Sequence, residues 1–249
     1  MSRAVYIVSY PGSGRTWLGL MVGKAIDLHF GLELTSGKAL LEGRFWLNPK
    51  VNMPEFHFVH ADRPYLKAIS KYRPQPEPKY RDAEIVFLAR DPRDIIVSMF
   101  FKFSRRWEVI KVRRFTGTLS EFMRHEKYGI EGIVAYYNLW ADAWTWQIHY
   151  EDMRENPNQE LAWMLRQLGM TASPETLDEA VQFASFDNMW KLESTNFNAW
   201  LRETKKGDPE SRRVRRGKVG GYVDYMTPDD IAFANEAMRG LDPYYGYGI

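Results

Sequence analysis

The order of strand-like and helix-like segments is the feature that most constrains the fold of this chain. Short runs rich in apolar and β-branched residues are typical of buried strands, and they occur at residues 4–9, 55–60, 83–90 and 145–150. Segments with helical spacing of apolar residues lie between or after them, at residues 15–29, 91–103, 130–144, 151–170 and 227–238. This alternation predicts an α/β fold, in which a central parallel sheet carries helices on both faces.

Local residues support several of these boundaries. Helix starts are indicated by Asp91 before Pro92, by Thr118 with Glu121, and by Thr227 with Asp230. The Pro-rich, polar stretch 73–80 is typical of a surface loop. There is no internal repeat and no low-complexity linker, so residues 1–249 are expected to form one domain.

Polar residues stand where the predicted strands end. The first predicted strand is followed by a polar loop after Ser9, and the other three end at His60, Arg90 and Tyr150. Parallel strands place their carboxyl ends at one edge of the sheet, and ligands of such sheets bind beyond that edge. The four strand ends are therefore expected to meet around one binding site.

Composition narrows the classes of ligand. The net charge is only +2, from 34 basic and 32 acidic residues, so no global field draws the protein to nucleic acid. The chain has no cysteine, and its five histidines form no closely spaced ligand pair, so no metal site is expected. No segment approaches the roughly 20 apolar residues of a membrane span, and the N-terminus lacks the pattern of a signal peptide. A cytoplasmic protein without a membrane span is the expectation.

The segment "SYPGSGRTW" (9–17) lies between the first predicted strand and the first predicted helix. It matches the phosphate-loop pattern GxxxxGK[ST] poorly, because Ser9 stands at the first glycine and Arg15 at the lysine. This weakens the prediction of an ATP–Mg²⁺ kinase of small molecules without excluding it. Backbone N–H groups at a helix start, with the hydroxyls of Ser13 and Thr16, still suit a phosphate or a sulfate.

Four segments in order resemble the soluble, cytosolic-type sulfotransferases, which use 3′-phosphoadenosine-5′-phosphosulfate (PAPS). These segments are "SYPGSGRTW", "FLARDPRDIIVSMFFKF" (87–103), "HYEDMRENPNQEL" (149–161) and "RRGKVGGY" (215–222). Together they span nearly the whole chain, in the order that the family has. The resemblance implies a three-layer fold of the P-loop-like type and in-line transfer of a sulfuryl group from PAPS to a hydroxyl or an amine. It implies PAP, the 3′,5′-bisphosphate, as product, and no metal.

The resemblance also implies which residues hold the donor. The first loop would bind the 5′-phosphosulfate through Gly12, Ser13, Gly14, Arg15 and Thr16. Arg90 and Ser98 would hold the 3′-phosphate, together with Arg215, Arg216 and Gly217. Trp17 and Phe186 would lie against the adenine, and Tyr150 would belong to the same site. Ala184 stands where the family usually has a threonine, so one hydrogen bond on the adenine side is in doubt.

For the chemistry, the resemblance implies that His60 is the base that removes the acceptor's proton. His57 is the rival, but strand alternation points it to the opposite face. The family has a lysine at the position of Gly12, where it stabilises the developing charge on the bridging oxygen. For this chain there are three alternatives: Arg15 stabilises that charge, a lysine from another segment stabilises it, or the reaction is slower.

The acceptor is not readable from the sequence, and a small molecule or a glycan is expected. A basic cluster at 102–114 is a weak candidate for contact with an anionic acceptor, and Arg212 and Arg213 have no assignment. The oligomeric state is unknown, because the family's C-terminal dimer motif is not evident. A nucleotide-binding module without activity is a further alternative, favoured by Gly12 and by Phe58 at another position where the family has lysine.

Overall fold

The computed structural model describes residues 3–61, 77–106, 114–194, 208–212 and 214–248. Its sheet has four strands in the order β2-β1-β3-β4, and every pair is parallel. The strands are β1 (Val5–Ser9), β2 (Phe56–Val59), β3 (Glu84–Ala89) and β4 (Trp146–His149). The predicted central parallel sheet is therefore confirmed, and each strand lies within the range predicted for it.

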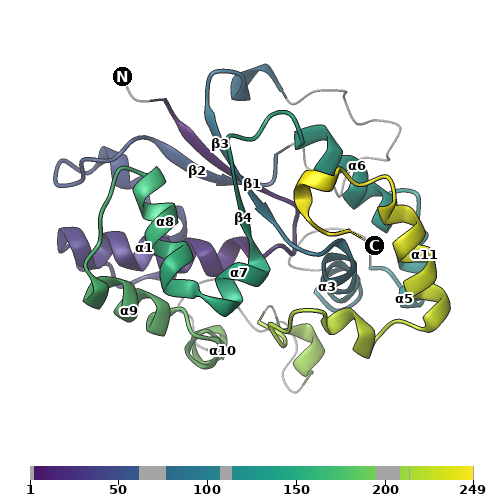
Figure 1. The fold of residues 1–249 in the computed structure, drawn as a ribbon. Helices are drawn as coiled ribbons and strands as arrows, with labels where there is room; N and C mark the ends of the chain where they lie inside the picture. Colours follow the sequence, from purple (N-terminus) through teal and green to yellow (C-terminus); the bar gives the residue numbers. More distant parts are fainter. Residues whose placement is uncertain (1–2, 62–76, 107–113, 195–207, 213, 249) are drawn as a thin grey trace.

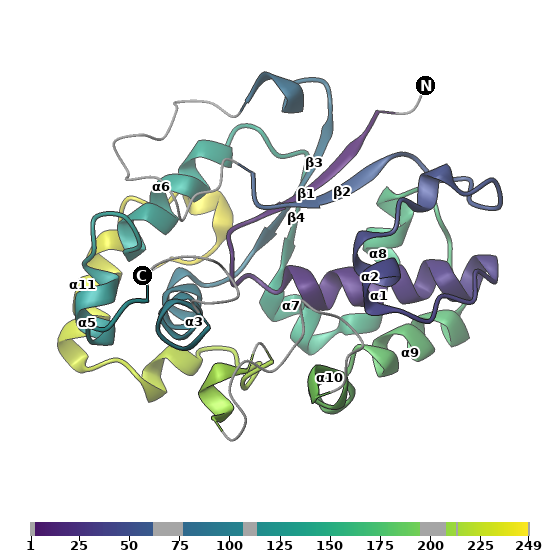
Figure 2. The same ribbon diagram turned by 180° about the vertical axis from the view of Figure 1, so that it is seen from behind.

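Helices cover both faces of this sheet, as the alternating sequence predicts. In Figure 1, α1 (Arg15–Phe30), α8 (Pro157–Gln167) and α9 (Pro174–Phe183) lie on one side of the strands. On the other side lie α3 (Pro92–Arg105), α6 (Ile130–Trp140) and α11 (Pro228–Met238), and the view from behind in Figure 2 shows the same division. The result is a three-layer sandwich.

The strand residues divide between two apolar clusters, one on each face. Ile85 and Phe87 belong to the cluster beneath α3 and α6, whereas Val86 and Leu88 belong to the cluster beneath α1 and α8. Successive side chains of a strand point to opposite faces, so a strand covered on both sides is apolar throughout. This explains why the segment 83–90 has a nearly continuous apolar run.

The remaining described elements are short. The α-helices are α2 (Gly37–Glu42), α5 (Leu119–Met123), α7 (Tyr150–Glu155) and α10 (Phe186–Ser194). The 3₁₀ turns are η1 (Phe45–Leu47), η4 (Pro78–Tyr80), η6 (Pro209–Ser211), η7 (Gly221–Asp224) and η8 (Pro243–Tyr245). Part of the predicted loop 73–80 thus forms η4, and residues 73–76 lie outside the described part of the chain.

Helix caps agree with the sequence signals. Asp91 accepts a hydrogen bond from the N–H of Arg93 at the start of α3, where Pro92 occupies the first turn. Complete capping boxes begin α5 at Thr118 and α11 at Thr227. These three starts are confirmed because each cap satisfies backbone donors that have no partner within the helix.

Two helix predictions differ from the structure in extent. The segment 151–170 holds the helix predicted to end at Gly169, α8 (Pro157–Gln167), but a separate short helix, α7, precedes it and ends at Glu155. Proline lacks the N–H that a continuous helix needs and starts a helix well, so it separates the two. The helix predicted at 130–144 ends at Trp140, and the following turn leads the N–H of Thr145 to the carbonyl of Ile85 at the sheet.

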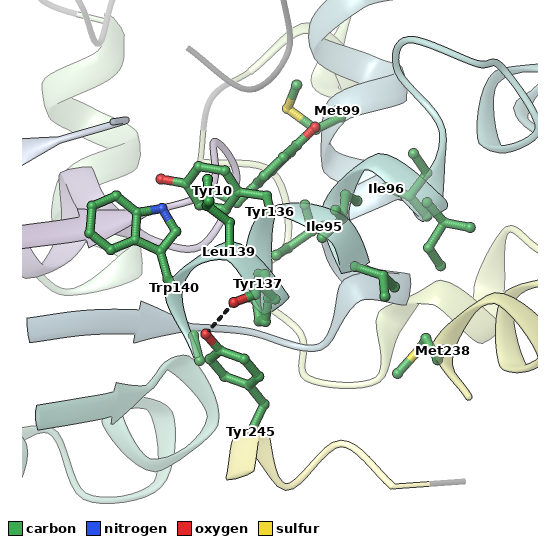
Figure 3. Close-up of a cluster of buried hydrophobic side chains, with 14 of the residues drawn as sticks. Tyr10, Ile95, Ile96, Met99, Tyr136, Tyr137, Leu139, Trp140, Met238 and Tyr245 are labelled. Carbon is green, nitrogen blue, oxygen red and sulfur yellow. Dashed lines mark hydrogen bonds between the residues drawn. The ribbon is translucent and has the colours of Figure 1, made fainter. Parts of the chain in front are cut away.

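Tyrosines on α6 join the core to the C-terminal end of the described chain. The hydroxyl of Tyr245 donates to the carbonyl of Tyr137 at 2.6 Å, and both residues are fully buried (Figure 3). Tyr136 and Trp140 from the same helix extend this cluster against β1 and β3. The N-terminal end of α3 lies beside this cluster, through Ile95 and Ile96.

Candidate anion-binding site

A cavity lies at the carboxyl edge of the sheet, where the sequence predicted a site. All the predicted site residues except Ser13 line it: Gly12, Gly14, Arg15, Thr16, Trp17, His60, Arg90, Ser98, Tyr150, Phe186, Arg215, Arg216 and Gly217. They come from six separate segments of the chain. The parallel topology brings the strand ends together, because β1, β2, β3 and β4 all end at this edge.

The first loop has a backbone that only glycine adopts easily. Gly12 has φ of +99° and Gly14 has φ of +96°, both in the left-handed range. Gly14 is also the N-cap of α1, and the first turn of this helix contains no acidic residue. The N–H groups and the dipole at this helix start therefore face no acidic side chain from the first turn of the helix, and they suit an anion.

Gly14 lies directly against an aromatic ring from the far side of the cavity. A Cβ atom on Gly14 would be 2.6 Å from Cδ2 of Tyr150, which is closer than side chains tolerate. Tyr150 begins α7, immediately after β4. The loop and α7 thus pack together only because residue 14 has no side chain.

The structure does not place Ser13 in the wall of the cavity. Its side chain is fully buried, and its Oγ has no hydrogen-bond partner among the described residues. Its N–H donates to the carbonyl of Tyr10 within the turn, at 3.3 Å. A contact between the Ser13 hydroxyl and an anion stays a prediction.

Arg90 connects three parts of the site. Its Nη1 donates to the carbonyl of Gly12 at 3.0 Å, and its Nη2 donates to the carbonyl of Lys218 at 3.3 Å. Its guanidinium group lies 4.2 Å from the centre of the Tyr150 ring and 3.6 Å from the carboxylate of Asp94. The Nε atom is buried and has no hydrogen-bond partner among the described residues. A guanidinium group with a buried, unused donor suits a phosphate.

The C-terminal segment is fixed to α3 by a buried carboxylate. Asp94 accepts the N–H groups of Gly220 at 3.0 Å and Tyr222 at 2.9 Å. Burial raises the pKa of Asp94, opposed by the charge of Arg90. These bonds hold the 214–222 segment against the cavity, where Gly217 has φ of +59°.

The cations of this segment are held by two carboxylates. Arg215 donates to Glu210 at 3.0 Å and to the hydroxyl of Tyr225 at 2.9 Å. Arg216 lies 3.5 Å from both Glu210 and Asp224. These carboxylates hold the guanidinium groups of Arg215 and Arg216 in place at the wall of the cavity.

Aromatic rings form another wall. The rings of Trp17 and Tyr150 meet edge to face, with centroids 5.6 Å apart, and the guanidinium of Arg154 lies 5.6 Å from the Trp17 ring. Phe186 lines the same cavity at the start of α10, beside Ala184. Flat, apolar surfaces of this kind suit a nucleobase.

His60 lies just beyond β2, and its ring is oriented by the end of β1. Nδ1 lies 2.9 Å from the carbonyl oxygen of Ser9, which is an acceptor only. In the neutral ring this contact places the proton on Nδ1 and the lone pair on Nε2. In that tautomer Nε2 is able to accept a proton.

The rival histidine is on another surface. His57 pairs with Glu55 at 2.8 Å and stacks on Tyr6, and it does not line the cavity. Arg15, by contrast, lines the cavity together with His60, and its Nη1 donates to the carbonyl of Phe58 at 3.0 Å. The side chain of Arg15 is thus directed from the first loop toward the end of β2.

Further residues line the cavity that sequence reasoning did not assign. They include Asp94, Arg154, Met189, Val214, Lys218, Gly221 and Tyr225. Asp94 had one available signal, since it lies one helical turn after Arg90. Lys102 and Arg106 of the basic cluster 102–114 also line the cavity, whereas Arg105 and Arg114 do not. Residues 107–113 lie outside the described part of the chain.

Within the described ranges, no group of three or more His, Asp or Glu side chains is arranged to hold a metal ion. None of the helices in the described part of the chain is long and apolar enough to cross a bilayer. Neither a metal site nor a membrane-spanning helix accompanies this cavity in the residues that the structure describes.

A family model and several known proteins match most of this chain. The family model described as the sulfotransferase domain matches residues 2–242. Sulfotransferase 1E1 from Bos taurus is 27% identical over 239 residues, which are 89% of this chain and 77% of that protein. The amine sulfotransferase from Oryctolagus cuniculus is 26% identical over 235 residues, 90% of this chain and 75% of that protein.

Solved structures show the same fold. Retinol dehydratase in complex with androsterone and the inactive cofactor PAP has a TM-score of 0.62 at 18% identity. That match covers 95% of this chain and 79% of the other. Mouse sulfotransferase SULT7A1 complexed with PAP has a TM-score of 0.60 at 20% identity, covering 96% of this chain and 83% of the other.

Proposed function

The chain belongs to the sulfotransferase domain family and is a sulfotransferase, and we propose that it moves the sulfuryl group of PAPS to a hydroxyl or an amine with His60 as base. The observation that carries this proposal is the distribution of anion-binding features around one cavity. The glycine loop with the start of α1 forms one anion-binding end. Arg90 and Ser98, with the segment Arg215–Gly217, form a second.

The donor's chemical parts fit these features. A 5′-phosphosulfate suits the N–H groups and left-handed glycines of the first loop, which Arg15 and Thr16 flank. A 3′-phosphate suits Arg90, whose buried Nε has no partner in the described residues. The adenine suits the aromatic wall of Trp17 and Phe186. Two separated anion-binding ends with an aromatic wall suit a bisphosphorylated nucleoside better than a triphosphate.

His60 would accept the acceptor's proton on Nε2. Bound PAPS supplies the sulfuryl group, so the acceptor oxygen forms a bond to sulfur as the bond between sulfur and the bridging oxygen of the 5′-phosphate breaks. The carbonyl of Ser9 holds the Nδ1 proton of His60 and would stabilise the imidazolium that results. Arg15, directed toward the same end of β2, would stabilise the charge that develops on the bridging oxygen, where Gly12 offers no side chain.

The experiment that tests this proposal compares ligands by thermal stabilisation. PAP is expected to raise the melting temperature, and ATP with Mg²⁺ is expected to raise it little. Stabilisation by ATP with Mg²⁺ but not by PAP would favour the kinase and overturn the proposal. Stabilisation by PAP without transfer from PAPS, over a broad panel of phenols, steroids and glycans, would favour a module that binds the donor without activity.

A further inference from the structure

Asp94 is a carboxylate in the wall of a cavity that is proposed to bind anions. It lies in the first turn of α3, lines the cavity and is only 3% exposed. Burial makes the ionised form of Asp94 costly and raises its pKa, although the charge of Arg90 opposes this. A negative charge at this place would also repel a phosphate that binds beside it. A carboxylate in this position therefore needs a gain that offsets both costs.

The bonds of Asp94 to the C-terminal segment supply such a gain. Its Oδ2 accepts the N–H of Gly220 at 3.0 Å, and its Oδ1 accepts the N–H of Tyr222 at 2.9 Å. Gly220 is the N-cap of η7 and has φ of +66°. The first N–H groups of a helical turn have no partner within that turn. Asp94 thus caps η7 from another part of the chain, and residues 220–222 fold around its carboxylate.

Arg90 holds the other side of the same turn. Its Nη2 donates to the carbonyl of Lys218 at 3.3 Å and lies 3.6 Å from Oδ2 of Asp94. The carbonyl of residue 218 and the N–H of residue 220 are therefore held by two side chains of opposite charge that also pair with each other. Because of this closed arrangement, a shift of the turn would also reorient the guanidinium group of Arg90.

The cations of the C-terminal segment are oriented within that segment. Arg215 and Arg216 both pair with Glu210, which belongs to the same part of the chain. These pairs do not set the distance from the two guanidinium groups to α3. The ring of Phe101 on α3 lies 4.2 Å from the guanidinium of Arg215 and helps to keep the segment at the helix. Neutralising Asp94 should therefore shift the segment without detaching it.

We propose that Asp94 positions Arg90 and the segment 214–222 for a 3′-phosphate, and so sets the preference of the cavity for a 3′-phosphorylated nucleotide. This inference rests on the proposed function and assigns the distinction between PAP and 5′-AMP to a positioning residue. Asp94 acts through its neighbours, because its oxygens are engaged by Gly220, Tyr222 and Arg90. Positioning and charge repulsion predict opposite results for a neutral residue 94: positioning predicts weaker PAP binding, and repulsion predicts tighter binding.

The first part of the experiment titrates Asp94→Asn with PAP and with 5′-AMP, which differs from PAP only in lacking the 3′-phosphate. Asparagine keeps the size of the side chain but offers one oxygen to two N–H donors. PAP affinity is expected to fall roughly tenfold, as loss of a bond to a charged group allows, and 5′-AMP affinity is expected to change little. Asp230→Asn is the matched control, since Asp230 is a buried carboxylate that accepts the N–H of Thr227 and does not line the cavity.

The control should lose stability and keep the wild-type ratio of the PAP and 5′-AMP affinities. Tighter PAP binding in Asp94→Asn would show that repulsion dominates and would overturn the proposal. An equal loss of both affinities would indicate a general structural role and would also overturn it. A wild-type protein that binds PAP no more tightly than 5′-AMP would contradict this inference, whereas one that binds no PAP would overturn the proposed function.

The second part measures amide hydrogen exchange in the peptide that covers residues 214–222. Exchange there should be faster in Asp94→Asn than in the wild-type protein, and saturating PAP should slow it less. Asp230→Asn should leave the exchange of this peptide unchanged. Exchange in Asp94→Asn that equals the wild-type rate, with and without PAP, would overturn the proposal, even where 5′-AMP binds too weakly to be titrated.

Discussion

The hydroxyl of Tyr137 is bonded to both backbone polar groups of Arg90. It accepts the N–H of Arg90 at 2.9 Å and donates to the carbonyl of Arg90 at 2.8 Å. Tyr137 is fully buried in α6, and burial raises the pKa of its hydroxyl, so the group is neutral and can do both. Tyr137 therefore fixes the backbone of Arg90, the residue that follows β3 and carries a guanidinium group of the site.

Tyr137→Phe is expected to weaken PAP binding roughly tenfold, because a buried N–H left without a partner costs about 1–3 kcal/mol and frees the backbone of Arg90. Tyr245→Phe is the control, since it removes a bond of the same kind from the same cluster without touching Arg90 (Figure 3). Calorimetric titration with PAP, alongside thermal melting, separates the two effects. Equal loss of PAP affinity in both variants would mean that Tyr137 acts on the core in general.

Arg90→Ala is expected to reduce PAP affinity by a factor of about 10–100, which corresponds to losing hydrogen bonds to a charged group. Its side chain also donates to the carbonyls of Gly12 and Lys218, so some loss of stability should accompany it. Binding measured by titration at a temperature well below the melting point checks the prediction. An unchanged affinity would remove Arg90 from the donor site.

His60→Ala is expected to lower turnover by a factor of about 10²–10⁴, the usual contribution of a general base. PAP affinity should stay nearly constant, because the proposed role of His60 lies at the acceptor. His57→Ala is the matched control, since that histidine pairs with Glu55 outside the cavity. Persistence of turnover in His60→Ala would require another base.

Gly14→Ala is expected to destabilise the protein and weaken PAP binding, because the new Cβ would meet the ring of Tyr150 at 2.6 Å. Gly31→Ala is the control: its φ is also positive, at +58°, but no atom lies within 4 Å of a Cβ placed there. Left-handed backbone alone costs about 1–2 kcal/mol, so Gly31→Ala should lose that much stability and no PAP affinity. Equal effects in the two variants would show that packing against Tyr150 is unimportant.

Asp230 gives a prediction for stability at low pH. Burial opposes its ionisation, but bonds from Arg124, Ser120 and Thr227 lower its pKa from 3.8 to about 2. A carboxyl group whose pKa is lower in the folded protein stabilises the folded state at pH values above its unfolded-state pKa. This stabilisation is lost as the pH falls through the folded-state pKa. The free energy of unfolding should therefore fall by about 2 kcal/mol between about pH 5 and pH 2 from this group.

Asp230→Asn is the variant that isolates this contribution. It should be less stable than the wild-type protein at pH 7 and should show a smaller decline toward pH 2. Urea unfolding at several pH values measures both quantities. A decline identical to that of the wild-type protein would assign the acid sensitivity to other carboxylates.

The sequence predicted the fold well wherever local chemistry decides the outcome. The segment 83–90 reads as a strand buried on both faces because its apolar run is continuous, and Thr118 and Thr227 mark helix starts through capping boxes. The break before Pro157 was missed because the apolar spacing continues across it. The spacing of apolar residues alone does not show at which turn a helix is interrupted.

Parallel strands bring their carboxyl ends together, so the sequence could predict that His60, Arg90 and Tyr150 meet at one cavity with the loop after Ser9. The roles of these residues stay predictions. What could not be predicted were the contacts between distant segments. The carboxylate of Asp94 meets the N–H groups of Gly220 and Tyr222 only in the folded chain, and the side chain of Ser13 turns out to be buried. These depend on how the C-terminal segment and the loop pack, which no local pattern encodes.

The two carbonyls that Arg90 contacts belong to Gly12 and Lys218, near opposite ends of the chain. During synthesis, the residues that line the cavity from the N-terminal side are complete long before Lys218 is made. The site therefore closes only after residue 218 has been made. A donor that binds both parts would stabilise a chain that extends past residue 218 and give little to a chain truncated before it.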